Sequence, residues 1–252
     1  MPDIFIPEEL VSALRNAERV GVLTGAGISA ESGVPTFRDA QSGLWAQYDP
    51  QELATAAAFR RNPRLVWEWY GWRRELIARA EPNPGHLALA EMERHIPHFT
   101  LITQNIDALH AVAGSRDLIE LHGNIRRNKC FREGQIIPET EAVEAEEGPP
   151  TCPRCGAFVR PDVVWFGEAL PEKALARAVF ATRQADVFLS IGTSTQVYPA
   201  AALPLEAVEH GAVTVEVNPQ LTPVTKWMDH VLQGPAGEVL PLLVARVWEE
   251  ER

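Results

Sequence analysis

The stretch VGVLTGAGISAESGVPTFRD, residues 20–39, joins a short, mostly apolar run to a turn rich in glycine. Residues 20–23 predict a buried strand, because a short apolar run is typical of strands covered on both faces. Gly25, Gly27 and Ala30 follow with the spacing G-x-G-x-x-A, which permits a tight turn and a close approach of the backbone to a pyrophosphate. By itself this spacing is a weak signal, since a glycine loop after a strand is often only a turn.

The continuation of the turn, ESGVPTFRDAQSGLW at residues 31–45, lacks the features of an ordinary dinucleotide-binding fold. Pro35 and the glycines disfavour a long helix. No predicted strand leads to an acidic residue about 20 positions after the turn, where such folds hold the ribose. We therefore expect a mobile loop that carries Phe37, Arg38 and Asp39 over a phosphate site and excludes water when it closes.

Later apolar runs repeat the strand signal, and helical patterns lie between several of them. Strands that alternate with helices predict an α/β fold, in which a Rossmann-like parallel sheet carries helices on both faces. Strands are expected at residues 99–103, 118–121, 163–166, 187–191 and 213–217, and helices at residues 7–19, 84–94, 171–184 and 199–210.

Two segments do not fit this alternation. Residues 43–80 look helical, with Asn62 and Pro63 as a start signal. Residues 124–160 contain the cysteines and a glutamate-rich stretch that we expect to be a solvated loop. We expect both segments to be insertions that form a small lobe. The Rossmann-like domain then comprises residues 1–42, 81–123 and 161–252.

Composition narrows the classes of partner. The chain has 252 residues and a formal net charge of −11, which disfavours a nucleic-acid surface and would suit a basic peptide. No apolar run approaches the ~18 residues of a membrane span, and the start MPDIFIPEEL lacks the basic and apolar regions of a secretory signal. We therefore expect a cytoplasmic protein with neither nucleic-acid nor membrane partners.

Polar residues follow two of the predicted strands. Gln104, Asn105 and Asp107 come directly after residues 99–103, so they fall at the carboxyl end of the sheet, where open α/β folds bind ligands. Helix capping by Asn105 or Asp107 is the other explanation. His122 follows the next predicted strand and brings an imidazole to the same edge, although a lone histidine is usually structural.

Together these motifs resemble those of the sirtuins, which are NAD-dependent protein lysine deacylases. GAGISAESGVPTFRD, TQNID, LHG, VVWFGE, GTS and VNP occur in the family's order and span nearly the whole chain. The resemblance implies that NAD is consumed as a co-substrate and that an acylated lysine of a protein substrate is bound as part of an extended peptide. The products would be nicotinamide, O-acyl-ADP-ribose and free lysine, and no hydride would move.

The resemblance also assigns roles to residues. It implies that Asn105 and His122 are catalytic: the acyl oxygen attacks the nicotinamide ribose, nicotinamide leaves, and His122 activates a ribose hydroxyl. Substrate contacts are implied at Val164, Phe166 and Gly167, where strand addition would give affinity without reading many side chains. The implied cofactor contacts are Gly25, Ala26, Gly27, Ser29, Ala30, Phe37, Arg38, Gln104, Asn105, Ile106, Asp107, Gly192, Thr193, Ser194, Asn218 and Ala236.

One pair of residues bears on the choice of acyl group. Tyr70 and Arg73 are three positions apart in a predicted helix and share a face, although aromatic and arginine side chains on a helix ordinarily serve packing. The pair resembles that of the sirtuin subgroup that removes succinyl and malonyl groups, in which it meets the acyl carboxylate. Ala54 matches the small residue that makes room for the longer acyl chain. We expect this preference, with acetyl-lysine activity retained.

Three cysteines, Cys130, Cys152 and Cys155, lie close together in the sequence and are too few for a disulfide framework, so they point first to a metal. Related sirtuins hold a structural zinc ion with two C-x-x-C pairs, whereas here Glu133 stands where the fourth cysteine would be. Three thiolates with a carboxylate or a water can bind zinc in a zinc-ribbon-like segment. A segment that folds without metal is the competing interpretation.

Three other functions compete with deacylation. An ADP-ribosyltransferase would break the same glycosidic bond, and labelled ADP-ribose would enter protein without any need for acyl-lysine. A dehydrogenase would need the acidic ribose ligand that this sequence lacks at the expected spacing, and reduced cofactor would reveal it by absorbance. A non-catalytic NAD sensor would have no need of His122.

Overall fold

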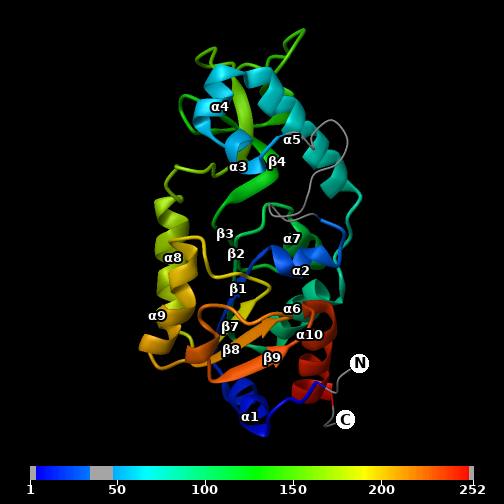
Figure 1. Ribbon diagram of the computed structural model, residues 1–252, viewed down its shortest axis with the longest axis vertical. Coiled ribbons are helices and arrows are strands. Elements are labelled where there is room, and N and C mark those ends of the chain that lie inside the picture. The colour runs from blue at the N-terminus through cyan, green and yellow to red at the C-terminus, as the bar shows by residue number, and fades with distance from the viewer. Residues whose placement is uncertain (1–3, 35–47, 250–252) are drawn as a thin grey trace.

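Six parallel strands form the main sheet of the computed structural model, which describes residues 4–34 and 48–249 (Figure 1). The α/β fold expected from the sequence is confirmed, and so are the strands expected at residues 20–23, 99–103, 118–121, 187–191 and 213–217. Phe37, Arg38 and Asp39 lie outside the described residues. Across the sheet the strands lie in the order β3 (Leu118–Glu120), β2 (His98–Thr103), β1 (Arg19–Thr24), β7 (Val187–Ile191), β8 (Val213–Asn218) and β9 (His230–Gln233).

The strand order changes direction at β1, which pairs with β2 on one side and with β7 on the other. Connections therefore leave β1 and β7 toward opposite sides, so the carboxyl ends of these two strands mark the switch point of the sheet. Open α/β sheets bind ligands at such a switch point. The residues that follow these strand ends are Gly25, Gln104 and Gly192, so the predicted motifs share one edge of the sheet.

Helices cover both faces of the sheet, as expected (Figure 1). One face packs against α1 (Glu8–Asn16), α6 (Pro84–His95) and α10 (Ala236–Val244), and its core includes Leu14, Leu89 and Leu240. The other face packs against α8 (Glu172–Arg183) and α9 (Leu203–Glu209) through residues such as Ala178 and Leu203. The other helices and short 3-10 or π segments of this half are α2 (Ala26–Ala30), α7 (Leu109–Ala113), η3 (Ala200–Ala202), η4 (Thr225–Trp227) and η5 (Ala245–Glu249).

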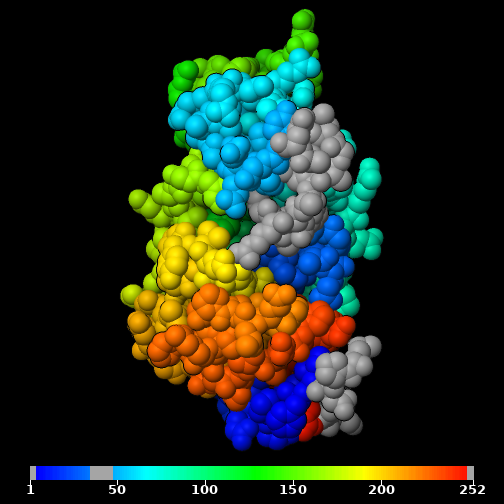
Figure 2. Space-filling model, in the orientation of Figure 1, coloured from blue at the N-terminus to red at the C-terminus, as the bar shows by residue number. Residues whose placement is uncertain are grey.

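The two interrupting segments lie together at one end of the molecule, where Figure 2 shows the helical segment in cyan. Asn62 caps α5 by accepting a hydrogen bond from the backbone N–H of Leu65, which confirms the start signal seen in the sequence. Phe59, Trp69, Tyr70 and other buried residues of this end form a second core. Its elements are α3 (Pro50–Leu53), α4 (Ala56–Arg61), α5 (Pro63–Ala78), η2 (Glu139–Glu141) and the strands β4 (Gly123–Cys130), β5 (Ile136–Ile137) and β6 (Val159–Val163).

The strand predicted at residues 163–166 is wrong. The strand there is β6, which pairs antiparallel with β4 in a small sheet, and it ends at Val163. Beyond it, Phe166 makes only a single bridge to Thr55. Pro161 belongs to β6 because it lies next to a register shift, where pairing tolerates a proline. Beyond Val163 the apolar run is therefore not a strand. Residues 164–167, called the strip below, leave the small sheet.

The division into domains stays a proposal. The expected domain boundaries at residues 123 and 161 fall within β4 and β6, the strands of the small sheet that adjoin the main sheet. Among the described residues, no helix combines the length and apolar character needed to cross a membrane.

Candidate active site

The glycine turn after β1 lies directly against the loop after β7. The backbone N–H of Gly27 donates to the carbonyl of Gly192 at 2.8 Å. A Cβ atom at Gly27 would lie 2.7 Å from that carbonyl oxygen, and one at Gly25 would lie 2.8 Å from it. Gly192 has φ +58°, and a Cβ there would lie 2.5 Å from the amide nitrogen of Ile28. Two backbone segments can touch this closely only where side chains are missing.

The turn opens a helix after all, but a short one. Gly25 is the N-cap of α2, whose five residues include Ala26, Ser29 and Ala30. The chain turns at residues 31–33, so α2 does not continue into a long helix over residues 31–34, and the rest of the predicted loop lies outside the described residues. Ser29 is buried, whereas Ala26 and Ala30 are exposed.

The amide side chains of the TQNID motif tie these loops together. Asn105 donates from Nδ2 to the carbonyl of Gly25 at 3.0 Å and to the Ser29 hydroxyl at 3.1 Å. Gln104 donates from Nε2 to Oγ1 of Thr193 at 2.9 Å. Because Asn105 is buried, its hydrogen bonds fix the amide in one orientation against the glycine turn.

Ile106 and Asp107, which follow Asn105 in the sequence, each accept a hydrogen bond that holds this part of the chain in place. Asp107 is buried and accepts a hydrogen bond from the backbone N–H of Leu109, the first residue of α7, at 2.9 Å, but the N-cap of this helix is Ala108 and not Asp107. Burial raises the pKa of the Asp107 carboxyl, and this hydrogen bond partly offsets that rise. The carbonyl of Ile106 accepts from the amide of Ile125 at 2.9 Å, so the motif is also joined to the small lobe.

His122 lies in the connection between β3 and β4, at the same edge. Its Nδ1 is 2.8 Å from the carbonyl oxygen of Gln104. A carbonyl only accepts, so Nδ1 carries the proton and Nε2 presents its lone pair. Burial lowers the pKa of His122, and the hydrogen bond to Gln104 opposes that shift. The imidazole is therefore neutral at pH 7 and able to take a proton at Nε2.

The strip at residues 164–167 joins His122 to the small lobe. The amide of Val164 donates to the carbonyl of His122 at 2.9 Å, and the amide of Phe166 donates to the carbonyl of Ala54 at 2.9 Å. The Phe166 side chain is 43% exposed, and Gly167 has φ +84° with no atom within 4 Å of a Cβ position. The strip turns at residues 165–168, where the amide of Glu168 donates to the carbonyl of Trp165 at 2.9 Å, and it is exposed at Phe166 and Gly167.

Tyr70 and Arg73 lie on one face of α5, as predicted, and both are buried. The Tyr70 hydroxyl accepts a hydrogen bond from the indole N–H of Trp165 at 2.9 Å, and the Arg73 guanidinium lies 5.3 Å from the ring centroid of Trp69. Burial raises the pKa of Tyr70 to about 12, so its hydroxyl keeps its proton. Burial lowers the pKa of Arg73, which the Tyr70 phenolate would oppose.

Two further predicted cofactor positions flank the glycine turn. Asn218, at the end of β8, donates from Nδ2 to the carbonyl of Thr193 at 3.3 Å, and Ser194 follows Thr193 in the same loop. Ala236 is the first residue of α10, and its carbonyl lies 3.1 Å from the position that a Cβ on Gly85 would take. The structure thus brings most predicted positions to one edge and places Ala236 where α10 meets α6.

A family comparison covers most of the residues described at this edge. The description "Sir2 family" matches residues 25–199, which include the glycine turn, the TQNID motif, His122 and the loop after β7. The chain belongs to the Sir2 family. Its fold, with a parallel sheet and a small lobe, is the Sir2 fold.

Relatives of this Sir2 chain are named NAD-dependent protein deacylases. A protein from Pseudomonas aeruginosa called NAD-dependent protein deacylase 1 is 51% identical over 245 residues, which cover 95% of this chain and 98% of that protein. An NAD-dependent protein deacylase from Aquifex aeolicus is 56% identical over 207 residues, which cover 82% of this chain and 86% of that protein.

Solved Sir2 structures superpose along nearly the full length. A crystal structure of a Sir2 homologue in complex with NAD has a TM-score of 0.90 and 44% sequence identity, with 99% of this chain and 96% of that chain covered. A structure described as Sir2 with a p53 peptide and NAD+ has a TM-score of 0.84 and 32% identity, with 98% of this chain and 99% of that chain covered.

The cysteines of this Sir2 chain form a compact cluster with Glu133. One ligand atom from each of Cys130, Glu133, Cys152 and Cys155 lies within 4.8 Å of all the others. The sulfur atoms of Cys130 and Cys155 are 3.4 Å apart, and the amide of Glu133 points at the Cys130 sulfur. Thiolates and a carboxylate at such spacing suit tetrahedral zinc, so these residues fit a structural zinc ion.

Sequence reasoning missed two buried histidines beneath the site. His86 lies with Nε2 3.3 Å from the Ser29 hydroxyl, and His110 lies with Nε2 2.9 Å from the Thr24 hydroxyl. Burial lowers the pKa of His86 to about 4 and that of His110 to about 3, so both are neutral. The signal for His86 was its place three residues after Asn83, the N-cap of α6, where it completes a capping box.

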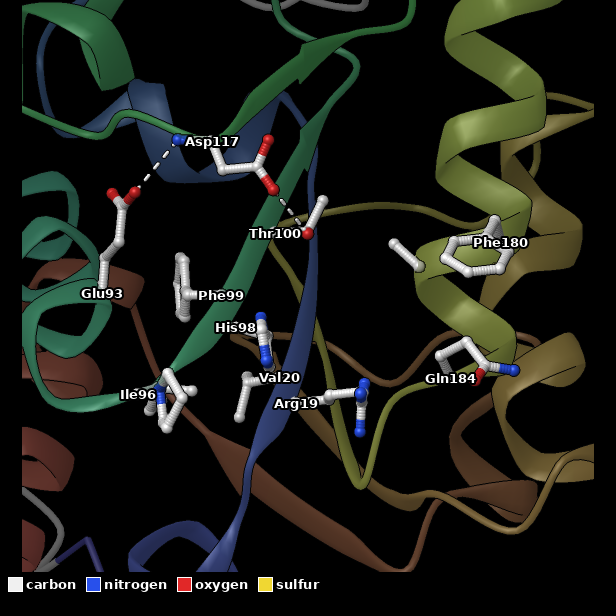
Figure 3. Close-up of a pocket in the computed structure, with 12 residues that line it drawn as sticks. Arg19, Val20, Glu93, Ile96, His98, Phe99, Thr100, Asp117, Phe180 and Gln184 are labelled. Atoms are coloured by element: carbon white, nitrogen blue, oxygen red, sulfur yellow. Dashed lines mark hydrogen bonds between the residues drawn. The ribbon is translucent and has the colours of Figure 1, made fainter.

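A separate pocket of about 500 Å³ lies at the other end of the strands (Figure 3). It is lined by Arg19 and His98, where β1 and β2 begin, and by Phe180 of α8. In its wall the Thr100 hydroxyl donates to Asp117 at 2.7 Å. The residues that match the Sir2 motifs follow the carboxyl ends of the strands, so this pocket is distinct from the candidate active site.

Proposed function

We propose that this chain is an NAD-dependent protein-lysine deacylase that transfers an acyl group from lysine to ADP-ribose. The products are nicotinamide, O-acyl-ADP-ribose and free lysine. The observation that carries the proposal is the hydrogen-bonded union of His122, Gln104, Asn105 and the glycine turn at one edge of the sheet. The names of the relatives and the NAD-bound Sir2 homologue support it.

The residues of this edge fit NAD. Gly25, Gly27 and Gly192 let the loops after β1 and β7 touch backbone to backbone, and glycine turns of this spacing allow a pyrophosphate to approach the main chain. Bound NAD supplies a ribose carbon that a weak nucleophile can attack and a nicotinamide leaving group. Gln104 and Asn105 then offer amide groups toward the ribose and nicotinamide end. Asp107, buried behind them, stiffens that end through its hydrogen bond to Leu109.

His122 acts as the general base. Its Nδ1–H is held by the Gln104 carbonyl, which fixes the tautomer and leaves Nε2 able to take a proton from a ribose hydroxyl. With the acyl oxygen bonded to the ribose carbon in place of nicotinamide, the deprotonated hydroxyl would attack the acyl carbon and the lysine would leave as the free amine. One water molecule would supply the oxygen that completes O-acyl-ADP-ribose. Because burial keeps the imidazole neutral, the base is ready at pH 7 without a preceding deprotonation.

The strip at residues 164–167 binds the substrate peptide. Val164 and Phe166 use their amide N–H groups within the protein, toward His122 and Ala54. A peptide that adds alongside this strip would deliver its lysine next to His122, and main-chain hydrogen bonds would tolerate varied sequences. The net charge of −11 favours basic peptides and opposes nucleic acid. A cytoplasmic location and the lack of nucleic-acid and membrane partners remain predictions.

The acyl group preferred by this site is acidic, as in succinyl-lysine and malonyl-lysine. Tyr70 offers a phenol that keeps its proton, and Arg73 offers a guanidinium on the same face of α5. A guanidinium and a hydroxyl together suit a carboxylate. Ala54 is buried beside the strip, and its small side chain leaves room for a longer acyl chain than acetyl.

Arg73→Met is expected to lower kcat/KM for a succinylated peptide by about 10- to 100-fold, the range of a lost charge-assisted hydrogen bond. An acetylated peptide of the same sequence should change by less than about threefold, since it offers no carboxylate. Mass spectrometry of both peptides, incubated with NAD, measures the two rates. Arg64→Met is the matched control, because Arg64 lies on α5 but pairs with Glu68 and Glu147 at the surface. Equal losses on both peptides in Arg73→Met would remove the carboxylate role.

The cysteine cluster is proposed to hold structural zinc. Protein washed with a weak chelator should retain about one zinc ion per chain, the content of a closed structural site. Cys152→Ala should retain none and should melt at a lower temperature. Elemental analysis of both proteins measures the metal, and a wild-type protein without stoichiometric metal would contradict the proposal. Glu133→Ala tests the carboxylate separately, because unchanged zinc retention in that variant would assign the fourth position to water.

Deacylation and protein ADP-ribosylation are separated by one experiment. Succinylated, malonylated and acetylated versions of one peptide are incubated with and without NAD, and their masses are followed. Loss of the acyl mass only with NAD supports deacylation. Transfer of labelled ADP-ribose from NAD to protein, independent of acyl-lysine, would support the transferase instead.

A further inference from the structure

Trp165 connects the peptide-binding strip to the helix that carries Tyr70. It is 1% exposed, and its indole N–H donates to the Tyr70 hydroxyl at 2.9 Å. Its ring lies 5.3 Å from that of Phe59, centroid to centroid, and 6.3 Å from that of Tyr70. The neighbours of Trp165 in sequence, Val164 and Phe166, pair with His122 and Ala54. Trp165 therefore contacts Tyr70, and its two neighbours in the sequence contact His122 and Ala54.

The Trp165 ring is also clamped by an ion pair between buried Arg160 and partly buried Glu168. The Arg160 guanidinium lies 3.3 Å from the ring centroid of Trp165. It pairs with both oxygens of Glu168, at 2.5 and 2.9 Å, and donates to the carbonyl of Val163. Glu168 also accepts the backbone N–H of Trp165 at 2.9 Å. A buried arginine needs such partners, and together they hold both the main chain and the ring of Trp165.

The direction of the hydrogen bond determines what Tyr70 can do. An indole N–H can only donate, so the Tyr70 oxygen is the acceptor and its own proton must point elsewhere. The indole of Trp165 donates to this hydroxyl, and Arg73 lies on the same face of α5. A hydroxyl held in this way is a donor aimed away from the indole and beside a guanidinium.

We propose that Trp165, clamped by Arg160 and Glu168, is a positioning residue for acyl selectivity, because it orients the Tyr70 hydroxyl to donate to a carboxylate on the acyl group. This inference rests on the proposed preference for acidic acyl groups. It adds that the preference depends on a residue that does not touch the carboxylate. It also links the acyl end to the strip, since the same tryptophan lies within the strip's backbone.

The test is a double-mutant cycle on the full chain with Trp165→Phe, Tyr70→Phe and both together. Phenylalanine keeps a ring against Arg160 and Phe59 but removes the indole N–H. Each single variant should lower kcat/KM for succinyl-peptide relative to acetyl-peptide by about three- to tenfold, mostly through KM for the succinyl-peptide. The double variant should lose no more selectivity than Tyr70→Phe alone, because the indole acts through that hydroxyl.

Controls separate positioning from folding. Trp67→Phe, on the same helix and stacked with Arg74, should leave the ratio of the two substrates unchanged. Melting temperatures identify any loss of fold, and Glu168→Gln gives a second variant that weakens the clamp while keeping the indole. It should lower the same ratio to a smaller extent. A Trp165→Phe variant that loses activity equally on both peptides, or that adds its full effect to Tyr70→Phe, would overturn the positioning role.

Failure of the inference and failure of the proposed preference look different. If Arg73→Met and Tyr70→Phe lower succinyl selectivity but Trp165→Phe does not, the positioning role alone is overturned. If none of the three variants changes the succinyl-to-acetyl ratio, the acidic-acyl preference itself is contradicted, and the inference falls with it. The predicted pattern is a lowered ratio in all three, with no additivity between Trp165 and Tyr70.

Discussion

His122→Ala is expected to lower kcat for deacylation by about 10²–10⁴-fold, the usual contribution of a general base. The loss should fall on kcat, since His122 contacts Gln104 through Nδ1 and leaves the glycine turn untouched. Binding of NAD, measured by calorimetry, should therefore change little. Initial rates with acylated peptide, followed by mass spectrometry, measure the effect.

His210→Ala is the matched control for this variant. His210 lies at the end of α9, where its Nδ1 is 2.8 Å from the carbonyl of Glu206, so it shares the backbone contact but not the site. Its removal should leave kcat unchanged. A His122→Ala enzyme with turnover within a few fold of the wild type would exclude His122 as the base.

The pH profile of the wild type follows from the same residue. The neutral imidazole is the active form, and burial lowers its pKa below the ordinary value of 6.5. Activity should therefore persist as pH falls to 6.5 and decline only at lower pH, as the imidazole takes a proton.

Gly27→Val is expected to lower the melting temperature by several degrees and to weaken NAD binding by more than about tenfold. The Cβ would lie 2.7 Å from the carbonyl oxygen and 2.8 Å from the Cα of Gly192, and both are backbone atoms that cannot rotate away. Overpacking of this kind costs about 1–3 kcal/mol. It also forces apart the two loops that form the proposed pyrophosphate cradle.

Gly71→Ala provides the contrast. Gly71 lies inside α5 with no atom within 4 Å of its Cβ position, so alanine should leave the melting temperature unchanged or raise it. Thermal melts and NAD calorimetry on the two variants measure the difference. A Gly27→Val protein that melts and binds NAD like the wild type would show that the contact with Gly192 is not needed.

Local patterns were enough to predict most of the main sheet. The strands at residues 99–103 and 187–191 are apolar runs between helices with clear end signals, such as Pro84 at the start of α6. The run at residues 163–166 failed because the true strand, β6, contains Arg160, Pro161 and Asp162. Arginine, proline and aspartate in a row are not typical of a strand. In the structure Glu168 pairs with Arg160, and the register shift next to Pro161 accommodates the proline.

Local sequence patterns predicted less of the candidate site than of the fold. Gly27 contacts Gly192 because β7 pairs with β1 in the sheet. The sequence of neither loop indicates which strands are paired. The predicted roles of Gly192 and His122 came from the resemblance to the sirtuins. The sequence did not indicate that Arg160 and Glu168 pair against Trp165, because two charged residues eight positions apart look like ordinary surface charges.

The central claim is that cleavage of NAD is coupled to removal of an acyl group from lysine. The most direct measurement is chromatographic quantification of nicotinamide and deacylated peptide in one reaction, with the unacylated peptide as a blank. Equal molar amounts of the two products, and almost no nicotinamide from the blank, are predicted. Nicotinamide released at the same rate from the blank, or acyl loss that proceeds without NAD, would contradict the account.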